Sequence, residues 1–168
     1  ICEPAPIAQT ICSMPSFAPQ YVKDGIAEID AIVANPKAPT FAHTIEAYEK
    51  SGEMLNVTLS CLFNLTNSDT NDELNAIETE ITPRLSEYSA TIRLNEGLFK
   101  RIKAVYDQRE KLKLTPEQAK LLDDIYESFA NNGANLSLED KETYRALTSK
   151  LSQLTLAYGQ NVLKATNA

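Results

Sequence analysis

From Tyr21 to the last residues of the chain, apolar residues return every three or four positions, and this period decides the fold class. Residues at this spacing lie on one face of an α-helix. Three of the predicted faces carry Leu98, Ile102 and Val105, then Leu122, Ile125 and Phe129, and then Tyr144, Leu147, Leu151, Leu154, Tyr158 and Val162. No stretch shows the alternation of apolar and polar residues that marks a half-buried strand. We therefore predict an all-α protein, an antiparallel bundle or array of about six helices.

Capping and breaking residues predict where the helices begin and end. Thr115 gives the clearest start signal, because Pro116 follows it and Gln118 completes a capping box. Further starts are expected after Thr40, Asn95 and Ser137, and within the polar turn 67–73. Pro83 should bend the helix that it interrupts, and Gly52 should kink or break its own.

The composition argues against two classes of partner. The 168 residues carry a net charge of −7 and a pI near 4.8, which disfavours binding to nucleic acid or to an anionic membrane. No apolar run approaches the roughly 20 residues that cross a bilayer. The three cysteines, Cys2, Cys12 and Cys61, have no metal-binding spacing, and so sparse a set is typical of a reducing compartment. We predict a cytoplasmic protein and leave the periplasm open.

Two segments differ in character. Residues 1–19 contain four prolines and scattered small residues, and we expect an extended arm whose fold is unassigned. Residues 20–168 form the predicted helical domain. Its last helical pattern runs to the end of the chain without a terminating glycine or proline, so we expect this domain to be truncated at its C-terminal end.

The single histidine limits the chemistry that the chain can perform. A zinc peptidase of the HExxH type needs two imidazoles one helical turn apart, with a glutamate that activates the metal-bound water. His43 has only Glu46 at a spacing that could share a metal, and two ligands do not make a site. We therefore predict that His43 is a solvated residue near the start of a helix.

Other candidate groups have ordinary structural interpretations. The sequence has no GxSxG motif for a nucleophilic serine, and Cys61 lies in an apolar run typical of a core position. The carboxylate pairs 123–124 and 139–140 fall on polar faces or first turns, where solvated side chains are usual. The polar turn 131–137 lacks the lysine of a phosphate-binding loop. We predict no catalytic residue and no metal ligand in this chain, and its substrate-binding residues are unknown.

Six short motifs follow one another along the chain: NPKAPTF, TIEAYEKSG, FNLTNSDTNDEL, VYDQRE, GANLS and NVLKATNA. Together they resemble the N-terminal helical region of the thimet-oligopeptidase family of zinc metallopeptidases. Within this family the likeness is to the bacterial branch of peptidyl-dipeptidase Dcp and oligopeptidase A. Each motif is weak alone, but six in order over residues 21–168 make a strong resemblance. Residues 1–19 depart from the family's N-terminal arm.

The resemblance implies a parent protein several times longer and almost wholly helical, with its HExxH zinc site outside this chain. In such enzymes two helical halves enclose a deep channel, and the N-terminal half forms a wall that admits short peptides. Members of the Dcp type remove dipeptides from peptide C-termini. The implied function is a non-catalytic portion of such a peptidase, with zinc as the parent's cofactor, short peptides as its substrates and the missing C-terminal catalytic half as this chain's partner.

A second interpretation comes from a different class. The chain could be a free-standing helical binding or adaptor domain without enzymatic activity. An HExxH motif some hundreds of residues downstream in the coding frame would favour the peptidase, and a stop codon after Ala168 would favour the adaptor. The sequence does not separate dipeptidyl-carboxypeptidase from endopeptidase activity.

The last helix has apolar residues on two sides. Its main stripe is accompanied by Leu156 and Leu163, which point elsewhere. A helix of this kind is normally covered on more than one side. We expect the missing half to cover the second side in the parent, and the isolated chain to self-associate or to fray beyond Gln160.

Overall fold

The structure, a computed structural model, describes residues 14–68 and 71–166, with side chains from residue 20 onward. Within these residues all regular structure is helical, which confirms the predicted fold class. Six α-helices of eleven or more residues are joined by shorter turns. The elements are α2 (Met14–Ala34), the π-helical turn η1 (Phe41–Glu46), the single turn α3 (Ala47–Lys50), α4 (Glu53–Ser68), α5 (Asp72–Arg93), α6 (Glu96–Tyr106), the 3-10 turn η2 (Arg109–Lys111), α7 (Pro116–Asn131) and α8 (Leu138–Thr166).

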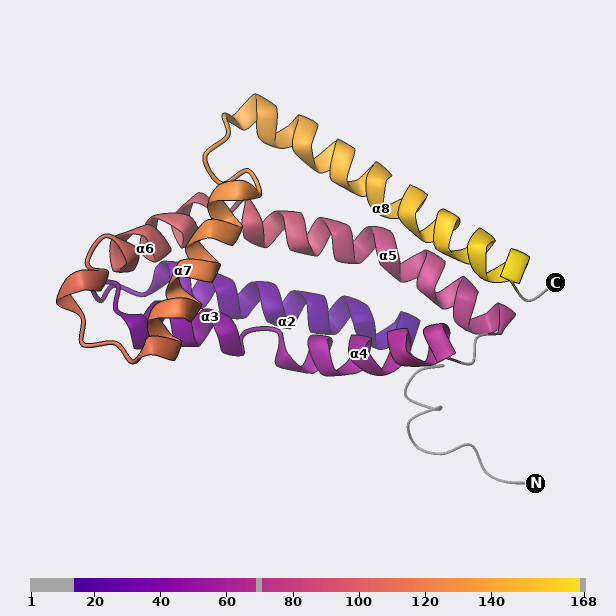
Figure 1. The fold of residues 1–168 in the computed structure, drawn as a ribbon, viewed down its shortest axis with the longest axis horizontal. Helices are drawn as coiled ribbons and strands as arrows, with labels where there is room; N and C mark the ends of the chain where they lie inside the picture. The colour runs from indigo at the N-terminus through magenta and orange to yellow at the C-terminus, as the bar shows by residue number, and fades with distance from the viewer. Residues whose placement is uncertain (1–13, 69–70, 167–168) are drawn as a thin grey trace, which may run out of the picture.

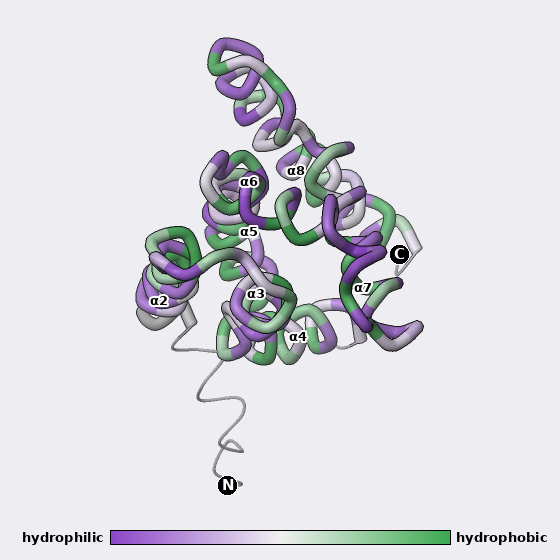
Figure 2. The backbone as a smooth tube through the Cα atoms, turned by 90° about the vertical axis from the view of Figure 1, so that its left-hand side faces the viewer, coloured by the Kyte–Doolittle hydropathy of each residue, from purple (hydrophilic) through white to green (hydrophobic). Residues whose placement is uncertain are grey.

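The long helices form layers along the long axis of the molecule. In Figure 1, α8 lies outside α5, and α5 lies between α8 and the pair α2 and α4. The chain runs in opposite directions in α5 and α8. Figure 2 looks along the bundle and shows α8 beside α5 and away from α2. Helices α6 and α7 close one end of the bundle. The C-terminal end of α8 lies at the other end, where it packs on α5 and is covered by little else.

The main hydrophobic core fills the end closed by α6 and α7. Leu98 and Ile102 of α6 and Leu122 of α7 are fully buried there, as their helical spacing predicts. Phe129 is also buried, and its ring meets Tyr48 edge to face at 5.4 Å. Fully burying one such apolar side chain contributes about 1.5–3 kcal/mol, so this end is the stable anchor of the fold.

A smaller core lies between α4 and α5. It is built on Leu62 and Ile81, which are almost completely buried, and Cys61 packs against them. Cys61 is half-buried at the edge of this core, so the predicted core position is confirmed only in part. Ile81 lies on α5 two residues before Pro83, which the helix contains without ending.

Local signals account for most helix boundaries. Thr115 and Gln118 form both hydrogen bonds of a capping box at the start of α7, and the side chain of Asn95 caps α6. Gly52 has a φ of 68° and separates α3 from α4, so the expected kink is a break. Its amide N–H donates to Glu28 Oε2 at 2.7 Å, which ties this break to α2.

Helix α2 begins earlier than the sequence analysis placed the helical domain. It starts at Met14, inside the segment 1–19 that was expected to be an extended arm. Pro15 falls in the first turn, where the missing N–H has no helical partner to lose. The rest of that predicted arm, residues 1–13, lies outside the described residues. None of the helices in the described part of the chain is both long and apolar enough to cross a membrane.

The predicted inward face of α8 is wrong. Leu147, Leu151 and Leu154 are about 60% exposed, at 63%, 63% and 58%, and Tyr158 is 72% exposed. The side that packs on α5 carries half-buried polar and small residues instead, with Leu156 and Leu163 half-buried near the C-terminal end. Polar contacts and ion pairs with α5 and α6, rather than apolar burial, set the rotation of this helix.

Candidate functional site

The residues that the sequence analysis considered for metal or acid–base chemistry either lie far apart or form hydrogen bonds with near neighbours in the chain. His43 is exposed, and its backbone N–H donates to Thr40 Oγ1 at 3.2 Å as part of the cap of η1. Glu46 is half-buried at the end of the same turn. Among the residues described, no three His, Cys, Asp or Glu side chains are placed so that they could hold a metal ion.

The two carboxylate pairs have ordinary surface roles. Asp124 forms an exposed ion pair with Lys120 one helical turn away. Asp140 accepts a hydrogen bond of 2.7 Å from Ser137 Oγ, and the same hydroxyl oxygen accepts from the backbone N–H of Asp140 at 3.2 Å. These bonds stabilise the first turn of α8 and bring no second acidic group into position for catalysis.

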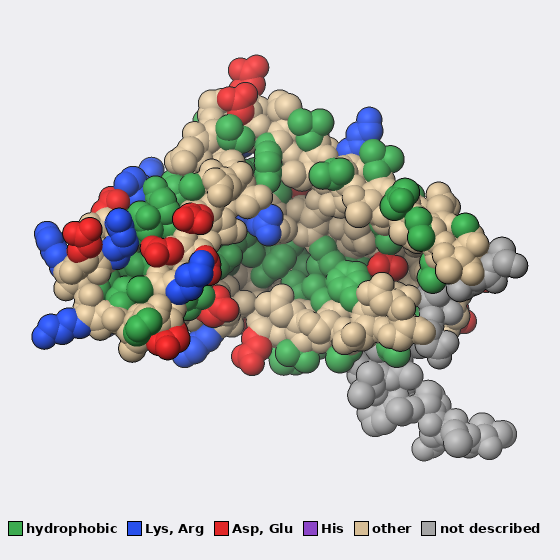
Figure 3. Space-filling view, in the orientation of Figure 1, with side chains coloured by type: hydrophobic (Ala, Val, Ile, Leu, Met, Phe, Trp, Pro, Cys, Tyr) green, Lys and Arg blue, Asp and Glu red, His purple; other side chains and the backbone are tan. Residues whose placement is uncertain are grey.

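A groove of about 730 Å³ lies between α4, α5 and α8 and is here called the α8 groove. Figure 3 shows this face of the molecule hollowed between α8 above and α4 below, with hydrophobic side chains on the floor. Phe63, Thr66 and Asn67 of α4, Asn75, Glu78 and Thr82 of α5, and Leu151, Ser152, Thr155, Leu156, Gly159, Gln160, Val162, Leu163 and Thr166 of α8 line it.

The groove exists because α8 presents short side chains to its neighbours. Ser152, Thr155 and Gly159 follow one another at spacings of three and four, so they lie along one face of the helix. Such side chains are too small to fill the space toward α4 and α5. Leu156 and Leu163 supply the apolar part of the same wall.

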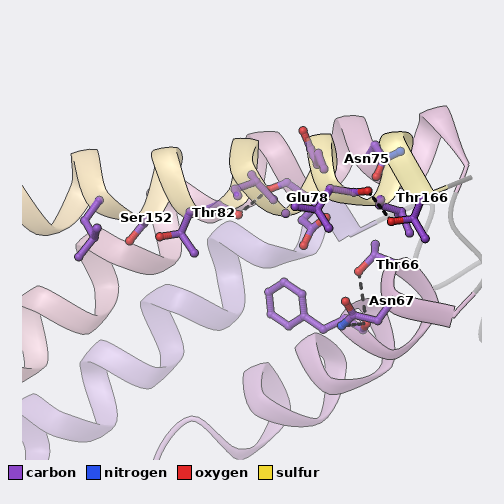
Figure 4. A pocket seen from close by; sticks show the side chains of 15 residues that line it. Thr66, Asn67, Asn75, Glu78, Thr82, Ser152 and Thr166 are labelled. Atoms are coloured by element: carbon purple, nitrogen blue, oxygen red, sulfur yellow. Dashed lines mark hydrogen bonds between the residues drawn. The ribbon is translucent and has the colours of Figure 1, made fainter. Parts of the chain in front are cut away.

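Several hydroxyl groups in the groove already use their protons. Thr82 Oγ1 donates to the carbonyl of Glu78 at 2.7 Å, Ser152 Oγ to the carbonyl of Thr148 at 2.9 Å, and Thr166 Oγ1 to the carbonyl of Val162 at 2.8 Å. A hydroxyl oxygen that donates its proton keeps lone pairs that accept hydrogen bonds. Figure 4 shows these side chains on the α5 and α8 walls. The hydroxyl groups therefore offer acceptors to a ligand, beside the amide groups of Asn67, Asn75 and Gln160, which can both donate and accept.

Glu78 is the one charged side chain among the described residues that line the groove. Partial burial raises the pKa of its carboxyl group, because the charged form loses water. Its carboxylate forms no ion pair with any described residue, whereas its neighbours on α5 do: Glu80 pairs with Arg84 at 3.0 Å, and Glu87 with Arg145 at 2.7 Å. Figure 4 places Glu78 between the residues of α8 and those of α4. The groove thus contains one carboxylate that no basic side chain of the described residues neutralises.

Polar contacts hold α8 beside the groove. Lys141 Nζ donates to Glu96 Oε1 at 3.0 Å, and this bond lowers the pKa of the Glu96 carboxyl group. Further along α8, Ser152 Oγ lies 3.3 Å from Ser86 Oγ, and Gln160 Nε2 lies 3.4 Å from Thr79 Oγ1. Because the two contacts with α5 lie beside the groove, they fix the wall that α8 gives to it.

The outer side of α8 is apolar and exposed. We call this surface the outer α8 stripe; it consists of Leu147, Leu151, Leu154, Tyr158 and Val162. Single exposed apolar residues are normal, but a contiguous row on one helix face marks an interaction surface. The groove and the outer α8 stripe meet at Leu151 and Val162, which belong to both.

The chain is similar to known peptidases. It is 37% identical over 147 residues to the dipeptidyl carboxypeptidase of Salmonella typhimurium, a match that covers 88% of this chain and 22% of that protein. It is 39% identical over 139 residues to the dipeptidyl carboxypeptidase of Escherichia coli, which covers 83% and 20%. With oligopeptidase A of Salmonella typhimurium it shares 25% identity, over 94% of this chain and 25% of that protein. No protein-family profile matches the chain.

These matches confirm the resemblance that the motifs carry. The chain's homologues are dipeptidyl carboxypeptidase and oligopeptidase A, which are members of the thimet-oligopeptidase family. The chain spans about a fifth of the length of the two dipeptidyl carboxypeptidases, 22% and 20%.

The sequence analysis did not find the α8 groove. It treated the apolar stripe of α8 as the inward face, so the row of small residues on the other side received no attention. Ser152, Thr155 and Gly159 at helical spacing are the signal that could have revealed a gap. Nothing in the sequence alone connects this row to Glu78, because the two are more than seventy residues apart and meet only through the packing of α8 on α5.

Proposed function

We propose that this chain is a non-catalytic N-terminal portion of a zinc metallopeptidase that hydrolyses short peptides. The peptidase is of the peptidyl-dipeptidase type, and the chain forms one wall of its substrate channel. One observation carries the proposal. More than four fifths of the chain, 88% and 83%, matches dipeptidyl carboxypeptidases that are several times longer, and the sequence has no HExxH motif.

Zinc belongs to the parent enzyme in this proposal and not to this chain. The described residues do not fit a zinc site, since His43 has no second imidazole and no group of three ligands is assembled. In this proposal the metal ligands and the general base lie in the catalytic half. This chain supplies a helical surface that limits which molecules reach them. We place the parent enzyme in the cytoplasm.

The outer α8 stripe supports a partner of this kind. In the parent enzyme the catalytic half would cover its exposed leucines, because the centre of a protein interface is usually apolar and buried. Covering apolar surface gains about 25 cal/mol per Å², from which the cost of association is subtracted. The stripe is thus the surface through which the chain would be held in the larger enzyme.

Co-expression tests the proposal. The chain is produced together with the polypeptide encoded downstream of it, and each is also produced alone. Hydrolysis of short quenched peptides is expected only when both parts are present, with a stable complex by gel filtration. We expect the chain alone to have no peptidase activity and no stoichiometric zinc after dialysis. Tightly bound zinc with chelator-sensitive turnover in the chain alone would contradict the proposal.

A pair of variants separates assembly from mere stability. Leu154→Glu places a charge on the outer α8 stripe, and Gln153→Glu places the same charge on an adjacent exposed position. The first is expected to prevent complex formation while the second leaves it intact. If the downstream polypeptide cleaves peptides at the full rate without this chain, the chain is instead a free-standing binding domain.

A further inference from the structure

Gly159 is a glycine that the backbone of α8 does not require. It is absent from the positions of positive φ among the described residues, where only Gly52 and Gly133 occur. A Cβ atom built at Gly159 meets no heavy atom within 4 Å, so a side chain here would have open space. Glycine inside a helix destabilises it relative to alanine. A glycine at this position leaves space that a larger side chain would fill, and that space is part of the α8 groove.

The chemistry of the groove selects the kind of ligand. Glu78 supplies a negative charge, and the hydroxyl oxygens of Thr82 and Ser152 are acceptors because their protons are used within the helices. Phe63 and Leu156 add apolar surface. A carboxylate with hydroxyl acceptors beside it and an apolar floor suits a side chain that has an aliphatic stem and a positively charged end. Lysine and arginine are the side chains of this form.

We propose that the α8 groove binds a short peptide by taking one of its lysine or arginine side chains, with the charged end against Glu78. The groove volume, about 730 Å³, lies within the range of about 300–1,000 Å³ that is usual for ligand pockets. A lone carboxylate with no further acidic ligand does not make a metal site, so the cation is an organic one. This inference rests on the proposed role of the parent enzyme in handling peptides and adds a preference for basic ones.

The groove is distinct in character from the outer α8 stripe. The stripe is apolar throughout, as a surface covered by another part of the same enzyme would be. The groove carries hydroxyl, amide and carboxyl groups beside its apolar floor, and these need polar partners if they are buried. A peptide offers such partners through its backbone N–H groups as well as its charged side chain.

Calorimetry tests the inference with three blocked pentapeptides on the 168-residue chain, at a concentration where light scattering shows the monomer and amide exchange shows α8 folded through Gln160. Each has an acetylated N-terminus, an amidated C-terminus and alanine at four positions. The central residue is lysine, norleucine or glutamate. The lysine peptide is expected to bind about tenfold more tightly than the norleucine peptide, as for one hydrogen bond to a charged group. The glutamate peptide is expected not to bind.

Three variants assign the effect to the groove. Glu78→Gln should remove the preference for lysine over norleucine. Glu80→Gln neutralises an exposed carboxylate on the same helix outside the groove, and it should keep the preference. Gly159→Leu fills the groove from α8 and should abolish binding of both peptides. Circular dichroism of Gly159→Leu should show unchanged helix content, since the new side chain enters open space.

The outcomes are distinct. Equal binding of lysine and norleucine peptides, or a lysine preference that survives Glu78→Gln, would overturn the inference. So would binding that Gly159→Leu leaves unchanged, or no binding at millimolar peptide. None of these results touches the requirement for both polypeptides in peptide hydrolysis, so the proposed function stands or falls by the co-expression experiment alone.

Discussion

Lys141 of α8 and Glu96 at the start of α6 form an ion pair of 3.0 Å in which the lysine side chain is only 6% exposed and the glutamate is 52% exposed. The pair joins the beginning of α8 to the anchored end of the fold. A buried ammonium group is costly unless it is paired, so the glutamate does more for stability than its exposure suggests.

The first prediction concerns this pair and pH. Lys141 lowers the pKa of Glu96 in the folded chain, so this carboxyl group contributes stability above its unfolded pKa, and the contribution is lost as the pH falls through the lower, folded pKa. Glu96→Gln should lower the melting temperature at pH 7. It should also make the melting temperature decrease less steeply as the pH falls into the acidic range. Lys141→Met added to this variant should restore the melting temperature at pH 7, because it removes the unpaired ammonium. A double variant as unstable as Glu96→Gln alone would contradict this account.

The second prediction compares two glycines. Gly159→Ala should stabilise the chain by about 0.5–1 kcal/mol, because alanine favours the helix and the new methyl group meets no atom. Gly133→Ala should destabilise it by more than about 1 kcal/mol, since Gly133 has a φ of 93° and a Cβ there would lie 3.0 Å from Leu136. Urea unfolding of both variants measures the difference. Equal effects of the two substitutions would be inconsistent with this structure.

The third prediction concerns Glu78 in the absence of peptide. Partial burial raises its pKa in the folded chain, so the folded state binds the proton more tightly than the unfolded state. Stability should therefore fall as the pH rises from the unfolded pKa through the raised, folded one. Glu78→Gln should slightly raise the melting temperature at pH 7 and weaken this part of the pH dependence. A lower melting temperature for the variant would show that Glu78 has a structural partner.

The sequence predicted features that depend on residues close together in the chain, and it failed for features that depend on contacts between distant residues. The capping box at Thr115 and the cap at Asn95 were predicted correctly, because these bonds form between residues three positions apart. The side of α8 that faces α5 was predicted wrongly. Its rotation depends on contacts such as Arg145 with Glu87, which are 58 residues apart in the sequence. A helical period shows which residues share a face, and it does not show what covers that face.

The candidate site illustrates the same limit. The unremarkable positions of His43 and Cys61 could be inferred from the sequence, since each follows from its immediate neighbours. The α8 groove could not, because it combines the absence of side-chain volume at Gly159 with a carboxylate from another helix.

The fourth prediction is that His43 is dispensable for folding. The side chain is exposed, and only the backbone N–H of this residue takes part in the cap with Thr40. His43→Ala should change the free energy of unfolding by less than about 0.5 kcal/mol, as for most surface substitutions. Thr40→Ala is the matched variant, and loss of this cap should cost about 1 kcal/mol. A loss above roughly 2 kcal/mol for His43→Ala would indicate a buried, partnered histidine.

The last prediction concerns the isolated chain and the outer α8 stripe. Leu147, Leu151, Leu154 and Tyr158 expose a row of apolar surface, and only the opposite side of α8 rests on α5. A contiguous patch beyond a few hundred Å² favours association. We expect the chain to self-associate at high concentration, or α8 to fray beyond Gln160, whose side chain contacts Thr79 of α5.

Light scattering over a dilution series measures the association, and amide exchange along α8 measures the fraying. Leu154→Glu should shift the chain toward the monomer, because a charge on the stripe opposes the burial of its neighbours. Gln153→Glu, which adds the same charge one position earlier outside the stripe, should leave the association unchanged. A strict monomer at high concentration with full amide protection to Thr166 would mean that α8 needs no cover on its outer side, and the stripe would then not be an interface.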